Sequence, residues 1–311
     1  MITKKYLDAL AASKFDLFKS KDIFKDNLEG LKKEIVSDLD QLAQLSLPEV
    51  YTERFDFFKL SGTIAEDFQE RILEVENEKF IVAGIRFRGL NVNKPFVSII
   101  ANFEITSDKL SDLAKLIKKN FSIFKPFAFQ FHLPSEVELI APDLGIDRYT
   151  IAGAIEDLID YKLPERPETV EIVELNNTDF YDEYIAEYTI FHKKNHELRD
   201  EVKPESLEVF KEAINNHLLY KVIIENEYAG IIAGAVSDYY GIHGVCIIEE
   251  ILYDSFKGKG FGVYLQKEFA KKLQDRHQLL WGTISSLNHS SLKTAFRNGR
   301  KVEEVEYSYK L

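Results

Sequence analysis

Three glycines alternate with larger residues in one short segment of the sequence. The segment consists of Lys257, Gly258, Lys259, Gly260, Phe261 and Gly262. It follows the apolar run VCIIEEILY and leads directly into VYLQKEFAKKL, where Leu265, Phe269 and Leu273 are spaced as on one face of a helix. Glycine loses more backbone entropy than other residues and offers no side-chain contact. Its repetition therefore indicates unusual dihedrals or a close approach of another group to the backbone.

The start of the predicted helix could hold a phosphate. The first N–H groups of a helix have no intrahelical partner, and the helix dipole places partial positive charge beside them. Glycines let a pyrophosphate come within hydrogen-bonding distance of these N–H groups. Lys257 and Lys259 add positive charge within an otherwise acidic chain. The alternative is a solvated surface turn with two lysines. The segment alone does not decide between a phosphate site and such a turn.

Two other phosphate motifs are not matched by this segment. A Walker A loop needs Ser or Thr after a Gly-Lys pair, and the sequence has none there. The dinucleotide fingerprint Gly-x-Gly-x-x-Gly differs in spacing from the Gly-x-Gly-x-Gly present here. That fingerprint also requires a β-α-β unit, whereas the strands before this turn are predicted to be antiparallel.

Two adjacent carboxylates, Glu249 and Glu250, lie in the strand that precedes the glycines. Successive side chains of a strand point to opposite faces. The expected neighbours on each face are aliphatic: Ile247 and Ile251 beside Glu249, and Ile248 and Leu252 beside Glu250. Such surroundings raise the pKa of a carboxyl by desolvation, which suits a general base near neutral pH. The alternative is that one of them caps a strand edge or pairs with a lysine.

Further elements follow in a regular order from residue 169 to the end of the chain. A strand (TVEIVEL) precedes two helices, which Asn177 or Thr178 and Pro204 are predicted to open. Three strands come next, and the short turns between them make neighbouring strands antiparallel. The glycine turn and its helix are followed by a strand (QLLWGTISS), a helix (SSLKTAFRNG) and a terminal strand (VEEVEYSYKL).

This order resembles that of the GCN5-related N-acetyltransferases (GNATs), which use acetyl-CoA. The family carries an Arg/Gln-x-x-Gly-x-Gly/Ala turn between its fourth strand and third helix. Residues 257–262 occupy that place, with lysine where arginine or glutamine is usual. About thirty residues further on, the family often has an Asn followed by a small residue, then an aromatic residue and a glycine. The segment Asn288-His289-Ser290-Ser291 and the later Gly299 match that spacing. The resemblance covers the C-terminal half of the chain.

The resemblance implies which residues would carry the chemistry. Contacts to acetyl-CoA are expected from Leu252, Tyr253, Lys257, Gly258, Lys259, Gly260, Phe261, Gly262, Asn288 and Ser291. Glu250 or Glu249 would act as the base that removes a proton from the acceptor amine. Many relatives have a tyrosine that acts as the general acid at the position where this chain has Ala295. The general acid is therefore left open between solvent, His289 and a tyrosine elsewhere.

The first half of the chain is predicted to be helical over residues 1–48 and then mixed. Two strands are expected within 79–105, a helix over 107–121 and a strand over 124–134. This series resembles part of the GNAT layout. Because only Thr106-Ser107 precede the predicted helix, it would be a degenerate copy that has lost the phosphate loop.

A boundary between two domains is predicted at the segment YKLPERPET, residues 161–169, which is rich in proline and charge. The expected domains are 1–163, an α/β domain that resembles a degenerate GNAT, and 164–311, a GNAT-like domain. The predicted fold class is α/β (α+β), with a mixed, mostly antiparallel sheet flanked by helices in two tandem domains. The first domain could wall off the acceptor cleft or mediate contact in a homodimer.

The composition limits the partners and the location. With 52 acidic and 40 basic residues the formal charge is −12, which argues against binding to nucleic acid or to an anionic membrane. The sequence contains no membrane-length apolar stretch and no convincing signal peptide, so we expect a cytoplasmic protein. The single cysteine, Cys246, is expected to be buried and reduced. The histidines lack metal-ligand spacing, so no metal site is predicted.

The function predicted from these residues is acetyl transfer from acetyl-CoA to a small-molecule or peptide amine. A non-catalytic protein that binds or senses acyl-CoA is the alternative, and the alanine at position 295, where a tyrosine is usual, keeps it open. A third hypothesis is an aminoacyl or acyl transferase that uses a larger donor. Such an enzyme would need a basic groove for tRNA, and the charge of −12 argues against it.

Overall fold

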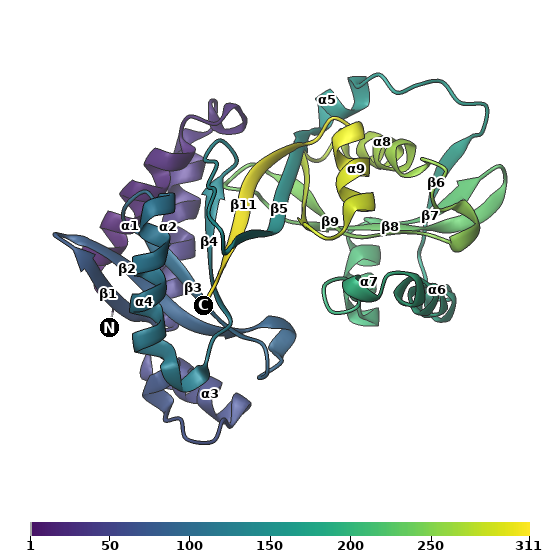
Figure 1. Ribbon diagram of the computed structural model, residues 1–311. Helices are drawn as coiled ribbons and strands as arrows, with labels where there is room; N and C mark the ends of the chain where they lie inside the picture. The colour runs from purple at the N-terminus through teal and green to yellow at the C-terminus, as the bar shows by residue number, and fades with distance from the viewer. Residues whose placement is uncertain (1) are drawn as a thin grey trace. The chain divides into compact units, whose positions relative to one another are not determined.

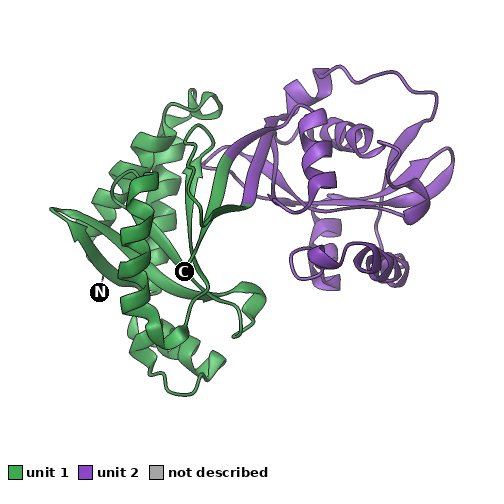
Figure 2. Ribbon diagram, viewed as in Figure 1, with its two compact units in different colours: residues 1–147, 304–311 green, residues 148–303 purple. Residues whose placement is uncertain are grey.

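The computed structural model describes residues 2–311 and divides into two compact units (Figures 1 and 2). Unit 1 runs to Asp147 and includes Glu304–Leu311, and unit 2 is Arg148–Glu303. Each unit contains its own helices and its own run of neighbouring strands. The predicted mixed, mostly antiparallel α/β fold in tandem is confirmed.

Unit 1 begins with three helices, followed by a meander of three strands, a fourth helix and a further strand. Its elements are α1 (Lys4–Phe18), α2 (Leu28–Gln44), α3 (Pro48–Phe58), β1 (Arg71–Glu76), β2 (Lys79–Phe87), β3 (Pro95–Ala101), α4 (Leu110–Phe121) and β4 (Ala128–Pro134). Helix α1 packs against α2 and against β3 and β4. The sheet order is β1-β2-β3-β4-β11, and β11 (Lys301–Lys310) pairs with β4 from Glu304 onward.

Unit 2 contains the elements that position the candidate site. They are β5 (Leu144–Ala154), α5 (Ile155–Asp160), β6 (Val170–Glu174), α6 (Tyr181–Lys194), α7 (Leu207–Asn215), β7 (Leu219–Ile224), β8 (Glu227–Val236), β9 (Gly244–Leu252), α8 (Gly262–Leu273), β10 (Leu279–Ser285) and α9 (His289–Arg297). The sheet order is β5-β10-β9-β8-β7-β6. The predicted order from β6 to β11 is confirmed, whereas β5 and α5 were not predicted.

Helices cover both faces of the unit 2 sheet. Figure 1 shows α5, α8 and α9 on one face and α6 and α7 on the other. The face under α8 is filled by aliphatic and aromatic residues such as Leu265, Phe269 and Leu280. The opposite face packs Tyr184 and Phe210 of the two other helices against the sheet. The apolar stripe of α8 that the sequence predicted is buried as expected, because Leu265, Phe269 and Leu273 are all inaccessible to solvent.

The two units share one arrangement of strands around a helix. In unit 1, the antiparallel meander β1-β2-β3 leads through α4 to β4, which pairs with β3 in parallel over Phe96–Ser98. In unit 2, the meander β7-β8-β9 leads through α8 to β10, which pairs with β9 in parallel over Gly244–Cys246. The predicted echo of the layout is thus present, and the chain before α4 lacks the alternating glycines that precede α8.

The boundary between the units differs from the predicted boundary at residues 163/164. Residues 148–163 belong to unit 2, because β5 pairs with β10 from Arg148 onward and α5 packs against α8. The segment 161–169 is fixed to α8 rather than acting as a free linker. The Tyr264 hydroxyl donates to the Pro164 carbonyl at 2.6 Å, and Lys267 Nζ donates to the Tyr161 carbonyl at 2.8 Å. Prolines and charges mark this segment as exposed in the sequence, but they do not show its packing.

None of the helices that the structure describes is long and apolar enough to cross a membrane. Within residues 2–311, no group of three or more His, Cys, Asp or Glu side chains is arranged to hold a metal ion.

Candidate functional site

Strands β9 and β10 separate shortly after they begin. Their parallel pairing covers Gly244–Cys246 and Leu279–Trp281, whereas β9 continues along β8 as far as Leu252. In the part of the chain that the structure describes, the later residues of β9 have no β10 partner. Another extended group could therefore pair with β9 on that side, although the Glu250 N–H already donates to Glu249 Oε1 at 2.9 Å.

A β-bulge lies in β9 where the two strands separate. Ala233 of β8 pairs with Glu249 and Gly234 pairs with Ile247, so Ile248 is the extra residue. Ile248 consequently packs on the α6 and α7 face, and Ile247 packs on the α8 face. The predicted neighbours were wrong in this respect, because strict alternation does not hold across a bulge. Ile248 lies on the face of Glu249, and Ile247 on the face of Glu250.

The three positions of the turn need glycine for different physical reasons. Gly258 and Gly260 have φ values of 76° and 79°, which side-chain-bearing residues rarely adopt. A Cβ on Gly258 would meet no atom within 4 Å, and one on Gly260 would meet only Arg297 Nη1 at 4.0 Å. The space in front of these two glycines is therefore open. A Cβ on Gly262 would lie 2.9 Å from Thr294 Cγ2, so this glycine allows α8 to pack closely on α9.

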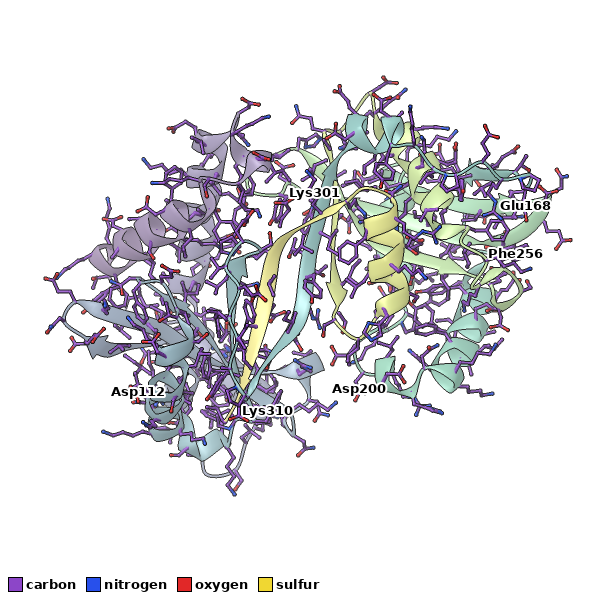
Figure 3. All side chains as sticks on the ribbon, turned by 45° about the horizontal axis from the view of Figure 1, so that its top comes forward. Asp112, Glu168, Asp200, Phe256, Lys301 and Lys310 are labelled. Carbon is purple, nitrogen blue, oxygen red and sulfur yellow. The ribbon has the colours of Figure 1, made fainter. Side chains whose placement is uncertain are left out.

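The first turn of α8 is electrostatically suited to an anion. Phe261 is at the N-cap, no side chain caps the helix there, and the first turn contains no acidic residue. Two arginines that the sequence analysis missed lie close to it. The Arg166 guanidinium lies 3.8 Å from the centre of the Phe261 ring and is paired with Glu168, whose Oε2 lies 3.1 Å from Arg166 Nη2. Arg297 Nη1 lies 4.0 Å from the position that a Cβ on Gly260 would take. Figure 3 labels Phe256 and Glu168, which belong to the two segments that meet at this turn.

The two lysines of the turn have different surroundings. Lys257 Nζ lies 3.8 Å from Glu187 Oε2 of α6, and burial lowers its pKa. Lys259 is exposed, and its Nζ lies 5.8 Å from the centre of the Phe256 ring. Lys257 therefore already forms an ion pair with Glu187 of α6, whereas the exposed Lys259 could bind an incoming anion.

The carboxylate of Glu250 is bound to α8. Its Oε2 accepts a hydrogen bond from Gln266 Nε2 at 2.5 Å, and Gln266 Oε1 accepts one from Arg300 Nη2 at 2.9 Å. Gln266 and Arg300 are buried. Burial raises the pKa of Glu250, while the Gln266 hydrogen bond and the Arg300 charge oppose this shift. Glu250 thus connects β9 to α8 through a buried polar network.

The carboxylate of Glu249 points to the opposite face, towards α6. Its Oε2 accepts hydrogen bonds from the hydroxyls of Tyr184 and Tyr188, the latter at 2.8 Å. Its Oε1 accepts the Glu250 backbone N–H at 2.9 Å. Desolvation raises the pKa of Glu249 to about 7, although these hydrogen bonds act in the other direction. Glu249 therefore has the proton affinity of a base that works near neutral pH.

The remaining predicted cofactor residues are packed within the fold. Leu252 contributes to the core under α8, and Tyr253 is buried with its ring 4.9 Å from that of Tyr228. Asn288 caps α9, because its Oδ1 accepts the Ser291 N–H at 3.3 Å. The structure brings Asn288 and Ser291 together through this cap.

Three further residues from the sequence analysis have clear positions. His289 is the first residue of α9 and is exposed. Ala295 is fully buried in a cluster with Ile151 of β5, so its side chain points into the core. Cys246 is a free, partly buried thiol, and desolvation raises its pKa to about 11.

We expect Gly262→Ala to destabilise unit 2 by about 1–3 kcal/mol, because the added methyl group would overlap Thr294 and approach Glu250 Oε1 at 3.0 Å. Urea unfolding would measure this loss. In a Thr294→Ala background the same substitution should cost less than about 1 kcal/mol, since the overlapping atoms are removed. A stabilising effect of Gly262→Ala in the native background, as helix propensity alone would give, would contradict the close packing of α8 on α9.

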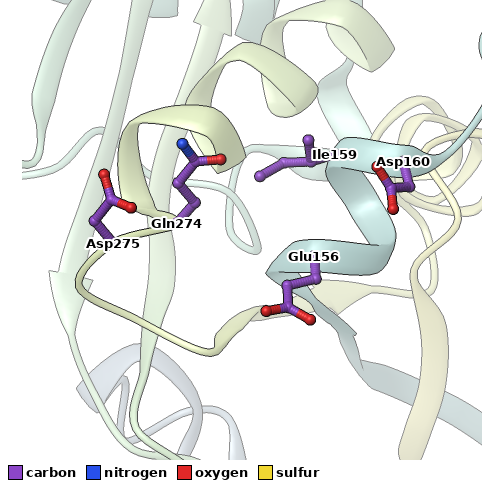
Figure 4. Close-up of a pocket in the computed structure, with 5 residues that line it drawn as sticks. All are labelled: Glu156, Ile159, Asp160, Gln274 and Asp275. Atoms are coloured by element: carbon purple, nitrogen blue, oxygen red, sulfur yellow. The ribbon is translucent and has the colours of Figure 1, made fainter.

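A hollow of about 320 Å³ lies between α5 and the C-terminal end of α8 (Figure 4). Its lining consists of Glu156, Ile159, Asp160, Gln274 and Asp275. Three of these side chains are acidic, so the hollow repels anions. It lies at the end of α8 opposite the glycine turn and contains none of the predicted site residues.

Comparisons with solved structures give matches of low sequence identity. A GCN5-related N-acetyltransferase from Sphaerobacter thermophilus aligns with 97% of this chain and 92% of its own, at 11% identity and a TM-score of 0.47. An acetyltransferase of the GNAT family from Colwellia psychrerythraea covers 77% and 84%, at 11% identity and a TM-score of 0.46. A tandem GNAT protein from the clavulanic acid biosynthesis pathway covers 76% and 84%, at 9% identity and a TM-score of 0.40. No family model and no curated protein matches the sequence.

The element order of unit 2 carries the resemblance in its own right. Two helices precede an antiparallel meander, and a glycine turn leads into α8 and then into a parallel strand. The strands on either side of α8 separate at a bulge, and the helix begins without a side-chain cap. Unit 2 has a fold like that of the GCN5-related N-acetyltransferases.

Proposed function

We propose that the protein is an acetyl-CoA-dependent N-acetyltransferase whose acceptor is a cationic amine. The observation that carries this proposal is the separation of β9 from β10 beside an open glycine turn at the start of α8. Such a combination suits an extended thioester donor, because strand groups could bind its pantetheine amides and uncapped helix N–H groups could bind its pyrophosphate.

The residues around the turn fit the donor chemically. Gly258 and Gly260 leave open space in front of the backbone, and the exposed cations Lys259 and Arg297 lie beside it. Acetyl-CoA would supply an activated acyl group on a good leaving group. This chain would hold its phosphates at the turn and offer a backbone N–H of β9 beyond Cys246 to the thioester oxygen, where negative charge develops during transfer.

Glu249 is the better of the two candidate bases. Its carboxylate lies on the face of α6, has no bound cation among the described residues, and has a pKa of about 7. Glu250 is connected to Gln266, Arg300 and the start of α8, which suits a structural role. The proton needed by the departing thiolate would not come from position 295, because Ala295 is buried and has no ionisable group, and we propose solvent as its source.

We further propose that unit 1 is a GNAT-like unit without a donor site. It repeats the meander, helix and parallel strand of unit 2. However, the segment before α4 contains Thr106, Ser107 and Asp108 in place of the glycine turn. An acidic residue at the start of the helix and the absence of glycine would both oppose a phosphate.

Binding of acyl-CoA without catalysis is the second candidate function, and the buried alanine at position 295 favours it. Calorimetry with acetyl-CoA, followed by detection of released CoA with a panel of amines, would separate the two candidates. The proposed enzyme should bind acetyl-CoA and release CoA with at least one cationic amine. Binding without release for every amine would favour the sensor, and absence of binding would remove both candidates.

A further inference from the structure

A buried carboxylate on the α6 face lacks a cationic partner. Glu249 is 6% exposed and receives three hydrogen bonds, all from neutral donors. Within residues 2–311, no lysine, arginine or histidine forms an ion pair with it. A buried charge without a counter-ion is expensive, so this site would be stabilised by a proton or by an incoming cation.

Unit 1 offers an internal comparison. The side chain of Glu70 is also buried, but Arg86 Nη1 donates to its Oε1 at 2.6 Å and Arg54 Nη1 lies 3.5 Å from the same atom. This chain therefore compensates a structural buried glutamate with two arginines. The two tyrosines around Glu249 supply hydrogen bonds but no charge, which sets this carboxylate apart from the structural one.

The two tyrosines that donate hydrogen bonds to Glu249 differ in the hydrogen bonds that their own oxygens accept. The Tyr184 hydroxyl donates to Glu249 and accepts the Glu205 backbone N–H at 2.6 Å, and its side chain has no exposed surface. The Tyr188 hydroxyl donates to Glu249, but in the described part of the chain no N–H group donates to it. Tyr188 also retains 5% exposure. The Glu205 N–H thus already donates to the Tyr184 oxygen, whereas the Tyr188 oxygen can accept its first hydrogen bond from an incoming donor.

We propose that the Tyr188 hydroxyl receives the acceptor ammonium and relays its proton to Glu249, with Tyr184 as a positioning residue. The inference rests on the proposed function and identifies the substrate as a primary amine that arrives in its protonated form. The ammonium group would supply the missing positive charge beside the Glu249–Tyr188 pair. Tyr184 would hold the carboxylate in place through its second hydrogen bond to the backbone of Glu205.

The proton balance of the relay is simple. One N–H bond of the ammonium breaks as its proton passes to the Tyr188 oxygen, and the phenolic proton of Tyr188 passes to Glu249 Oε2. The tyrosine is neutral before and after, the amine gains a free lone pair, and the carboxylate becomes a carboxylic acid. Burial raises the pKa of both tyrosines, so neither loses its proton to solvent. The proton on Glu249 leaves to solvent after transfer.

Methylammonium can serve as both ligand and acceptor in the test. In protein labelled with ¹³C at the tyrosine ζ carbon and supplied with CoA, it should shift the Tyr188 resonance at least about threefold more than that of Tyr184. Potassium at equal ionic strength should not do so. With acetyl-CoA and methylamine, Tyr188→Phe should lower kcat about 100-fold, which is typical for the loss of a proton-transfer group.

Two matched variants separate the relay from simple packing. Tyr181 lies on the same helix, and its hydroxyl donates to the Glu205 carbonyl rather than to Glu249. Tyr181→Phe should therefore leave kcat within about twofold. Tyr184→Phe should lower the melting temperature, because it leaves the Glu205 N–H without its partner, and it should keep kcat at least about tenfold above that of Tyr188→Phe.

The outcomes distinguish the relay from the proposed function. CoA release that Tyr188→Phe does not slow would overturn the relay and leave the acetyltransferase in place. A selective methylammonium shift at Tyr188 without any CoA release would support the amine site and contradict acetyl transfer. Absence of both the shift and the release would overturn the relay.

Discussion

Replacement of Gly260 by aspartate should reduce the affinity for acetyl-CoA by at least about 100-fold. The residue has a φ of 79° and faces open space, so the new carboxylate would lie where the donor phosphates are proposed to bind. A charged hydrogen bond contributes about 1.5–3 kcal/mol, and repulsion between like charges adds to its loss. Calorimetry with acetyl-CoA would measure the change.

Gly260→Asn is the matched control for this experiment. Asparagine has the same shape as aspartate and tolerates a positive φ about equally well, but it carries no charge. We expect it to weaken binding about tenfold or less, and both variants should melt at similar temperatures. Equal loss of affinity in the two variants would show that backbone strain, rather than charge, is responsible. Unchanged affinity in Gly260→Asp would remove the phosphate site from this turn.

Replacement of Glu249 by glutamine should slow acetyl transfer by about 10²- to 10⁴-fold, since it removes the proposed base. Affinity for acetyl-CoA should remain within a few-fold of the native value, because the carboxylate faces α6 and lies away from the glycine turn. Steady-state kinetics and calorimetry together would test this. A variant that retains the native rate would eliminate Glu249 as the base.

The same substitution should change how stability depends on pH. Folding raises the pKa of Glu249 from 4.5 to about 7, so between these values the folded protein holds more protons than the unfolded chain. The contribution of this group to stability therefore falls as pH rises through this window, by roughly 3 kcal/mol. Below pH 4.5 both states are protonated, and above pH 7 the loss is complete.

Urea unfolding of both proteins at pH 4.5 and pH 8 would measure this effect. Glutamine cannot titrate, so the stability of the native protein relative to Glu249→Gln should decrease by roughly 3 kcal/mol between the two pH values. Other titrating groups contribute equally to both proteins and cancel in the difference. Parallel stability profiles would show that the pKa of Glu249 is not raised on folding.

Local patterns were sufficient to predict most elements of the site. The three-to-four-residue spacing in α4 and α8 identified both helices, and the strand pattern with short turns identified the meander β7-β8-β9. These features depend on neighbouring residues along the chain, so periodicity describes them well. The location of the glycine turn between β9 and α8 follows from the same information.

The bulge in β9 could not be predicted in this way. The run VCIIEEILY has apolar residues on both faces of the strand, so its pattern does not show where the alternation is interrupted. Only the pairing with β8 identifies Ile248 as the extra residue. This pairing decides which aliphatic side chains surround Glu249 and Glu250. It also places Glu249 beside Tyr184 and Tyr188, whose role as hydrogen-bond donors was not apparent from their spacing on a helix.

Contacts between distant segments account for the other omissions. Arg166 lies in the segment that was interpreted as a linker, and only its packing on Phe261 shows its relation to the turn. Strand β5 contains glycines and charged residues, and its partner β10 is far along the chain, so its sequence gave little sign of a strand. The unit boundary was misplaced for the same reason.

Hydrogen exchange of the backbone amides in residues 258–263, with and without acetyl-CoA, tests the central claim most directly. If these N–H groups hold the donor pyrophosphate, acetyl-CoA should slow their exchange by at least about tenfold and also slow exchange in β9 beyond Cys246. Saturating acetyl-CoA that leaves exchange in residues 258–263 unchanged, or that protects only other segments, would contradict the account.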